Sequence, residues 1–213
     1  MPDRAILFVD GSNWYHALGR AGIRDRARLD YLKISQKLVG PRTWLATRYY
    51  IGQVMQEGNT HLYTQQRTFL ASLEHSDAGI SVHLGRIEPR KAENKAAKEL
   101  RQYLASLQSR IEPRIYAELS AIASRHAEAE VFVEKAVDVH LAVDLVTMAM
   151  NDSYDAAYLL TADGDFTPAV NAARALAKKV YAASPLLGWQ LSQAVNSFIH
   201  LRPDWFQDCY RTI

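Results

Sequence analysis

Short apolar runs that lead into polar turns alternate with amphipathic stretches along most of the chain. The runs at Arg4–Asn13 and Ala156–Thr161 have the composition of buried strands, and each leads into an Asp-Gly turn. Further strands are predicted at Trp44–Ile51, Ile80–Leu84, Val131–Val133 and Lys179–Ala183. Helices are predicted at Trp14–Leu18, Leu29–Leu38, Thr60–Ser72, Val139–Met150, Thr167–Ala177 and Gln190–Phe198. This alternation predicts an α/β fold with a mainly parallel central sheet and helices on both faces.

Residues Glu88–Ala129 differ from the rest of the chain, because they are rich in Ala, Glu, Lys, Arg and Leu at helical spacing. The pentapeptide RIEPR occurs twice there, at Arg86–Arg90 and Arg110–Arg114, and each proline stands where a helix can begin. We therefore expect two helices. They form a helical hairpin inserted at about residues 86–130 into a single domain that spans residues 1–213.

The composition excludes several classes of protein. Hydrophobic residues make up 48% of the 213 positions, which is enough for a buried core. The single cysteine, Cys209, excludes a disulfide within the chain and a cysteine-rich zinc site, and it favours a cytoplasmic location. We see no signal peptide and no apolar run that could span a bilayer, so no membrane partner is expected. A net charge of +2 neither favours nor excludes nucleic acid.

Aspartates follow the two most apolar strands. Asp10 ends the first strand, and Asp163 and Asp165 follow the second. Because the carboxyl ends of parallel strands meet at one edge of a sheet, we expect these side chains at the same edge. Asp144 lies within an otherwise apolar helix, where a carboxylate needs a partner. A divalent cation such as Mg²⁺ relieves the repulsion between packed carboxylates and can activate a water against a phosphodiester.

Ordinary structural roles are open for the same residues. The Asp-Gly steps at 10–11 and 163–164 can be simple turns, and Asp138 can cap the helix that follows it. A phosphatase of the haloacid-dehalogenase type is a further alternative, but its chemistry needs a second aspartate where this chain has Ser12. Nucleotide-binding motifs of the P-loop or dinucleotide type are absent.

Three segments, taken in order, resemble the NYN family and in particular its LabA-like branch, within the wider PIN-like nuclease group. They are FVDGSNWYH at Phe8–His16, EKAVDVHLAVDL at Glu134–Leu145 and YDAAYLLTADGDFTPAV at Tyr154–Val170. The resemblance implies a three-layer PIN-like fold and a metal-dependent (endo)ribonuclease that uses Mg²⁺ or Mn²⁺. The long helical stretch before Glu134 departs from the short segment of many LabA-like proteins, which puts the family's choice of substrate in doubt here.

The resemblance also implies roles for individual residues. Asp10, Asp144 and Asp163 would be the main catalytic metal ligands, with Asp165 alongside. Asn13 would orient Asp10 or a substrate oxygen, unless it only caps a turn. Other supporting residues at matching positions are Ser12, Asp138, Thr161, which would hydrogen-bond a carboxylate of the site, and Lys135, which would hold a phosphate unless it is merely solvated.

Residues Arg86–Arg114 carry eight basic and four acidic side chains, a local charge of +4. One interpretation is a basic arm whose side chains contact the phosphate backbone of RNA, namely Arg90, Lys91, Lys95 and Lys98, with Tyr103 free to stack on a base. The other is a solvated hairpin or the contact of a homodimer. Two functions are open: a metal-dependent ribonuclease, and a weakly active or inactive RNA-binding regulatory protein on the same fold.

Overall fold

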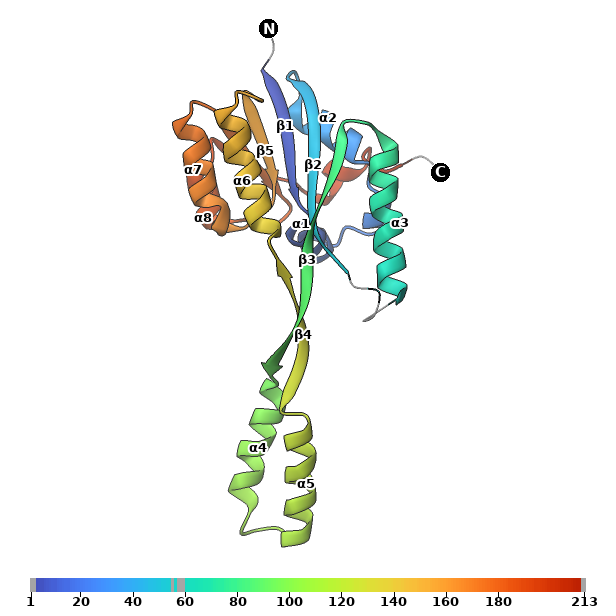
Figure 1. Cartoon of the computed structure of the whole chain (residues 1–213), viewed down its shortest axis with the longest axis vertical. Coiled ribbons are helices and arrows are strands. Elements are labelled where there is room, and N and C mark those ends of the chain that lie inside the picture. Colours follow the sequence, from blue (N-terminus) through green and yellow to red (C-terminus); the bar gives the residue numbers. More distant parts are fainter. Residues whose placement is uncertain (1–2, 55, 57–59, 212–213) are drawn as a thin grey trace. The chain divides into compact units, whose positions relative to one another are not determined.

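The computed structural model describes residues 3–54, 56 and 60–211 (Figure 1). The chain divides into two compact units. Unit 1 comprises Met1–Arg86 with Lys135–Ile213, and unit 2 comprises Ile87–Glu134. Each unit is described by itself.

Strands and helices alternate in unit 1, as the apolar pattern predicts. Its strands are β1 (Arg4–Asp10), β2 (Thr43–Gln53), residues 80–86 of β3 (Ile80–Glu93), β5 (Ala156–Leu160), β6 (Lys179–Ser184) and β7 (Ser197–His200). Its helices are α1 (Gly11–Arg20), α2 (Tyr31–Val39), α3 (Thr60–Ser76), α6 (Val137–Met150), α7 (Thr167–Ala175) and α8 (Trp189–Ala194). Short 3-10 turns are η1 (Arg26–Arg28), η2 (Gly164–Phe166) and η3 (Pro203–Phe206). None of the helices in the described part of the chain is long and apolar enough to cross a membrane.

The sheet has the strand order β4-β3-β2-β1-β5-β6-β7, where β4 is Glu128–Lys135. The neighbouring strands of unit 1 pair in parallel. This confirms the predicted mixed α/β fold with a mainly parallel sheet. Since β1 is central, its carboxyl end lies between those of β2 and β5.

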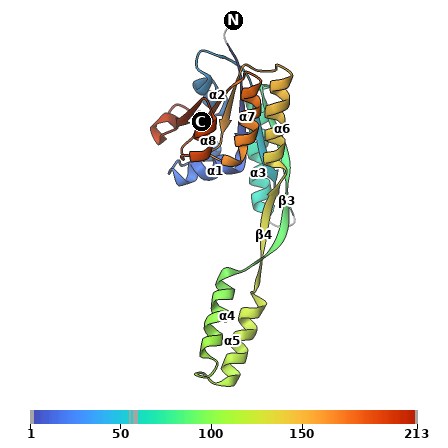
Figure 2. The ribbon, with the colours of Figure 1, turned by 90° about the vertical axis from the view of Figure 1, so that its left-hand side faces the viewer.

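Helices cover both faces of the sheet, and Figures 1 and 2 show the two helical layers. Alternate residues of β1 point to opposite faces, so that Leu7 and Ile6 belong to different buried clusters. One cluster includes apolar residues of α1, α2 and α3, and the other includes those of α6, α7 and α8. Trp14 of α1 is fully buried, and its indole N–H donates to the Tyr31 hydroxyl at 3.1 Å. Each face of the sheet therefore carries a buried apolar cluster.

Unit 2 contains the two predicted helices, α4 (Lys95–Leu107) and α5 (Pro113–Arg125). They are preceded by residues 87–93 of β3 and followed by β4. Asn94 caps α4 by accepting from the backbone of Ala97, and its own N–H donates to the Ala127 carbonyl at 2.9 Å. The two helices predicted within Glu88–Ala129 are therefore present, and both ends of this stretch belong to strands.

The two RIEPR copies adopt different structures. Pro113, in the second copy, stands in the first turn of α5 as predicted. Pro89, in the first copy, lies inside β3 and begins no helix. The first copy belongs to β3, and β3 has β4 as a neighbouring strand. Hydrogen bonds with a neighbouring strand satisfy the backbone of an extended segment, so the first copy does not need to form a helix.

Two further predictions need correction. Asp138 does not cap α6, because the residue before the helix is Ala136 in a left-handed conformation and Asp138 lies in the first turn. The last predicted helix, Gln190–Phe198, ends early at Ala194. The chain then becomes extended and forms β7, whose Phe198 pairs in register with Ala182 of β6.

Candidate functional site

Asp10 is the last residue of β1, and only 3% of its surface is exposed. Its Oδ1 accepts from the backbone N–H of Asn13 at 3.2 Å, and its Oδ2 accepts from the Thr161 hydroxyl at 3.0 Å. The first bond makes Asp10 the N-cap of α1, so this Asp-Gly step begins a helix and is not the simple turn weighed above. The second bond ties the end of β1 to the end of β5.

Gly11 allows α1 to begin directly after Asp10. A Cβ at this position would lie 2.7 Å from the Tyr50 carbonyl and 2.6 Å from the Tyr49 ring. A side chain would therefore push the helix away from β2 and move the carboxylate of Asp10 with it.

Thr161 joins two aspartates. Its hydroxyl is buried, donates to Asp10 and accepts from the backbone N–H of Asp163 at 3.1 Å. Asn13 strengthens the same junction, because its side-chain oxygen accepts from the backbone N–H of Ala162 at 3.2 Å. The loops after β1 and β5 are thus held together by side-chain bonds rather than by the sheet alone.

Asp163 and Asp165 follow β5 at the same edge of the sheet. Asp163 caps η2, since its Oδ1 accepts from the backbone N–H of Asp165 at 2.9 Å. Asp163 is half-buried and Asp165 is exposed. Thr161 links the Asp10 carboxylate to the backbone of Asp163, and a shared metal between the two carboxylates stays a prediction.

Asp144 has a different set of partners. Its Oδ2 accepts from the Arg48 guanidinium and from the Tyr50 hydroxyl, both at 2.7 Å. Arg48 also donates to the Tyr50 hydroxyl at 2.8 Å, and the Tyr50 ring stacks on His83 with centroids 4.8 Å apart. The partner that an acid in an apolar helix requires is therefore a cation on β2.

This contact sets the charge of the group. Burial raises the pKa of the Asp144 carboxyl, but the hydrogen bonds from Tyr50 and Arg48 and the charge of Arg48 outweigh burial and hold that pKa below its ordinary value. Burial, followed by the charge of Arg48, lowers the pKa of His83. At neutral pH the cluster is thus an ionised carboxylate paired with a guanidinium beside a neutral imidazole.

The donor set at the sheet edge fits a hard divalent cation. Asp10 and Asp163 offer carboxylate oxygens, and Mg²⁺ in proteins commonly binds one or two carboxylates while keeping several waters. Within the described residues, no three His, Cys, Asp or Glu side chains gather closely enough to hold a metal ion. The roles of Asp144 and Asp165 as further ligands stay predictions.

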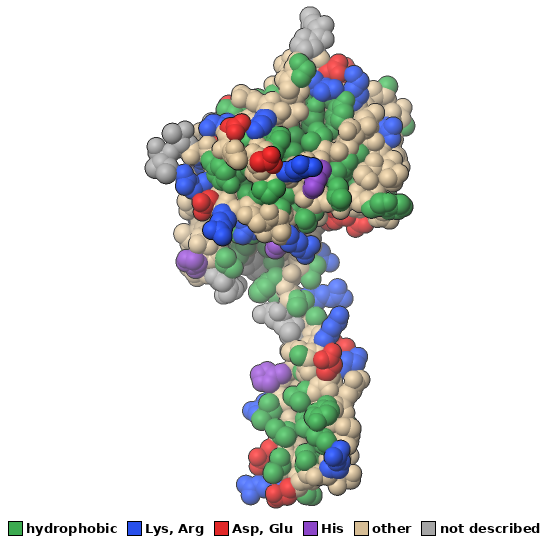
Figure 3. Space-filling view, turned by 180° about the vertical axis from the view of Figure 1, so that it is seen from behind, with side chains coloured by type: hydrophobic (Ala, Val, Ile, Leu, Met, Phe, Trp, Pro, Cys, Tyr) green, Lys and Arg blue, Asp and Glu red, His purple; other side chains and the backbone are tan. Residues whose placement is uncertain are grey.

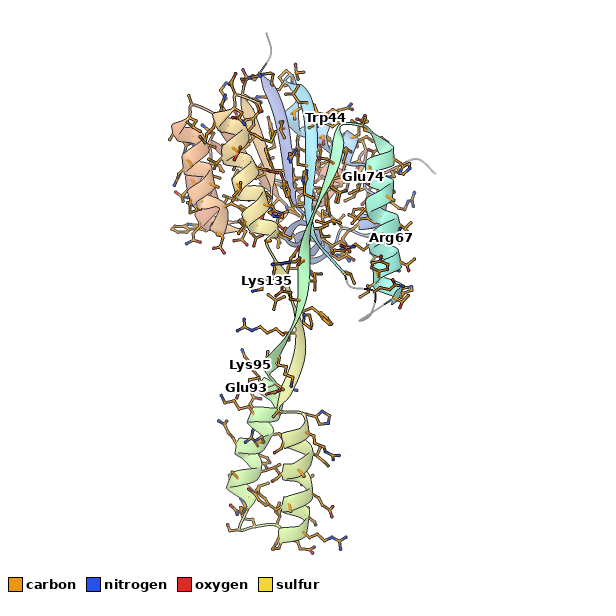
Figure 4. All side chains as sticks on the ribbon, viewed as in Figure 1. Trp44, Arg67, Glu74, Glu93, Lys95 and Lys135 are labelled. Carbon is orange, nitrogen blue, oxygen red and sulfur yellow. The ribbon has the colours of Figure 1, made fainter. Side chains whose placement is uncertain are left out.

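The remaining predicted residues lie on α1, β4 and α6. Ser12 is half-buried in the first turn of α1, and Asp138 is exposed in the first turn of α6. Lys135 is the exposed last residue of β4, where Figure 4 labels it. Their proposed contacts with a substrate stay predictions.

The sequence analysis missed two features of the site. One is the Arg48–Tyr50 pair, which approaches Asp144 from β2. The other is an open hollow of about 500 Å³ next to the Asp163 turn. It is lined by Gly164, Asp165, Thr167, Pro168, Trp189, Gln190 and Gln193. The sequence shows Trp189 and the acidic turn separately, but it shows neither that the tryptophan is exposed nor that the two are neighbours.

The charges of unit 2 are balanced. Residues 87–134 contain eight basic and eight acidic side chains, so the excess in the first half is cancelled by the second. Lys91 pairs with Glu128 at 3.3 Å and Lys98 with Glu93 at 3.0 Å, all of them exposed. The basic arm stays a prediction, and this balance weakens it.

Comparison with known proteins agrees with the fold. The NYN domain family matches residues 94–202, more than half of the chain, a range that includes Asp144, Asp163 and Asp165 but not Asp10. A protein of unknown function from Vibrio parahaemolyticus has a similar crystal structure, with a TM-score of 0.53 over 93% of this chain and 92% of that chain at 16% identity. No curated protein matches the chain.

Proposed function

Because this chain belongs to the NYN domain family, which suggests the PIN-like nuclease superfamily, we propose that it is a metal-dependent ribonuclease. One observation carries the proposal: Asp10 and Asp163, from strands far apart in the sequence, are linked through Thr161 at the carboxyl edge of a parallel sheet. Ligand sites of open α/β sheets lie at this edge.

The protein's own groups have separable tasks. Asp10 and Asp163 would hold Mg²⁺ or Mn²⁺, which when bound supplies an activated water and neutralises charge on a phosphodiester. Thr161 and Asn13 link the two loops through hydrogen bonds and would thereby hold the two carboxylates in place for the metal. Asp165 is exposed next to Asp163, so that the metal or the substrate would be able to reach it. In this proposal Asp144 contributes less to metal binding, because Arg48 and Tyr50 already engage it.

The ion pair between Asp144 and Arg48 also supports the alternative function. If Asp144 keeps Arg48 as its partner, the edge has fewer free carboxylates, which favours an RNA-binding regulatory protein with weak activity. A measurement of metal-dependent RNA cleavage distinguishes the two functions.

The test is incubation of labelled single-stranded RNA with the whole protein in Mn²⁺, in Mg²⁺ and after addition of EDTA. We expect cleavage in either metal and none in EDTA, because the carboxylates alone supply no activated water. Binding of RNA without metal-dependent cleavage would support the regulatory protein instead.

Three finer assignments concern the branch of the family, the location of the protein and its domain organisation. We further propose that the chain belongs to the LabA-like branch, is cytoplasmic, and is one NYN domain in which unit 2 is an insertion. The three matching segments and the lone buried Cys209 support these assignments.

We propose that unit 2 is the contact of a homodimer rather than a basic arm. Apolar side chains lie exposed on its helices (Figure 3), among them Leu100 of α4 and Ile115, Leu119 and Ile122 of α5. The residues of α5 recur at spacings of four and three, which is the pattern of a helix packed against another helix.

A further inference from the structure

Apart from Asp165, the residues that line the hollow beside the Asp163 turn have no part in the proposed cleavage. Its lining comes from two segments: the residues of η2 and α7 that follow Asp163, and the residues of α8. It therefore opens within unit 1, next to one of the two proposed metal-binding carboxylates.

Trp189 gives this hollow an aromatic wall. Its side chain is 77% exposed, whereas Trp14 is fully buried and Trp44 and Trp205 are half-buried. A single exposed apolar residue is common on protein surfaces and proves nothing alone. What distinguishes Trp189 is that it lines a hollow together with polar side chains, among them Asp165, Gln190 and Gln193.

The position of Trp189 is fixed by close backbone packing. A Cβ at Gly188 would overlap the carbonyl of Ala162, and a Cβ at Gly164 would overlap the side chain of Gln190. The start of α8 thus rests directly on the loop between Thr161 and Asp165. Trp189 is held next to the acidic turn by these contacts.

The polar lining suits the edge of a nucleobase. Gln190 and Gln193 each carry an amide that both donates and accepts, and the Asp165 carboxylate accepts. The carboxylate would repel a phosphate, but it can accept from an amino or imino group of a base. An aromatic face combined with amide and carboxylate groups is the chemistry that stacks on a base and reads its edge.

We propose that this hollow is a subsite for one unpaired nucleobase of the RNA strand whose phosphodiester lies at Asp10 and Asp163. The base stacks on Trp189, and Gln190, Gln193 and Asp165 contact its polar edge. This inference rests on the proposed function, since it names the part of the substrate that the site holds beside the cleaved bond.

The test is binding of a fluorescently labelled single-stranded RNA in EDTA, compared with the same strand made of abasic residues. Trp189→Ala should weaken RNA binding roughly 5- to 150-fold, the range measured when a stacking aromatic is removed. It should leave binding of the abasic strand unchanged. Trp189→Phe should keep most of the affinity.

Leu187→Ala is the matched control. Leu187 is two residues away and 76% exposed, but it does not line the hollow. This variant should bind both strands as the wild type does. An equal melting temperature for the two alanine variants would show that neither change acts through the fold.

Three results would overturn the subsite: equal RNA affinity for the Trp189 and Leu187 variants, an equal loss of affinity for the abasic strand, or no RNA binding by the wild type. Unchanged RNA affinity in the Trp189 variant would point to a protein partner on this surface. Cleavage in Mn²⁺, measured on the same proteins, separates the two claims. If Trp189→Ala alone weakens RNA binding and the wild type does not cleave, the subsite is supported and the nuclease is contradicted. If the wild type cleaves and Trp189→Ala binds RNA as tightly as Leu187→Ala, only the subsite is contradicted.

Discussion

An Asp163→Asn variant is expected to lose at least about 100-fold of the Mn²⁺-dependent cleavage of single-stranded RNA. The change removes one charged ligand of the proposed metal and keeps the size of the side chain. The amide oxygen of asparagine can still accept from the backbone of Asp165, so the turn at η2 should remain. A bound metal is worth several kcal/mol in such a reaction, and about 1.4 kcal/mol is a factor of ten.

The control for this variant is Asp204→Asn, which removes the same charge from an exposed position in η3. Cleavage rates would be measured for both variants at saturating Mn²⁺, with melting temperatures as a check of folding. The Asp204 variant should cleave as the wild type does. A folded Asp163 variant that cleaves within a few-fold of the wild type would exclude Asp163 from the metal site.

Thr161→Val is expected to reduce both stability and cleavage. Valine has nearly the shape of threonine, but it can neither donate to Asp10 nor accept from the backbone of Asp163. A buried hydrogen-bonding group left without its partner costs about 1–3 kcal/mol of unfolding free energy. Misplacing a catalytic group by as little as about 1 Å can cost roughly 100-fold, so we expect a loss of cleavage between about 10- and 100-fold.

The measurements are urea denaturation and cleavage in Mn²⁺, with Thr161→Ser as the matched variant. Serine keeps the hydroxyl and loses only a methyl group, so it should restore most of the activity. If valine and serine lower cleavage equally, the hydroxyl is not what holds Asp10 and Asp163 together.

The place of Asp10 and Asp163 at one edge of the sheet could be predicted because it depends on rules that act within short segments. An apolar run of strand length ends at an acid in both places, and parallel strands end at one edge. The register places Val9 opposite Leu160, so the residues that follow each strand are neighbours. The bond from Thr161 to Asp10 is a consequence of that register.

The partner of Asp144 could not be predicted in the same way. Arg48 is 96 residues earlier in the chain, and the meeting depends on how α6 is rotated and placed over β2. The periodicity of a helix indicates which of its faces is buried, but not which strand lies beneath each residue. The position of Asp144 among apolar neighbours indicated that it has a partner, and the structure shows that this partner is Arg48.

Local sequence also did not predict secondary structure correctly where a neighbouring strand determines it. The same pentapeptide forms part of β3 at Arg86–Arg90 and leads into α5 at Arg110–Arg114. Ser197–His200 continues an amphipathic stretch but forms an edge strand, because β6 offers it unpaired backbone groups. In each case hydrogen bonding to a neighbouring strand outweighs intrinsic helical preference.

The most direct test of the central claim is titration of Mn²⁺ into the whole protein, followed by electron paramagnetic resonance of the free ion. We expect the wild type to bind Mn²⁺. Asp10→Asn should bind the ion at least about tenfold more weakly, because it lacks a charged ligand. Asp144→Asn should lose less Mn²⁺ affinity, because Arg48 already engages the Asp144 carboxylate in the wild type. If the Asp10 variant binds Mn²⁺ as tightly as the wild type, the ion is not held at this edge of the sheet.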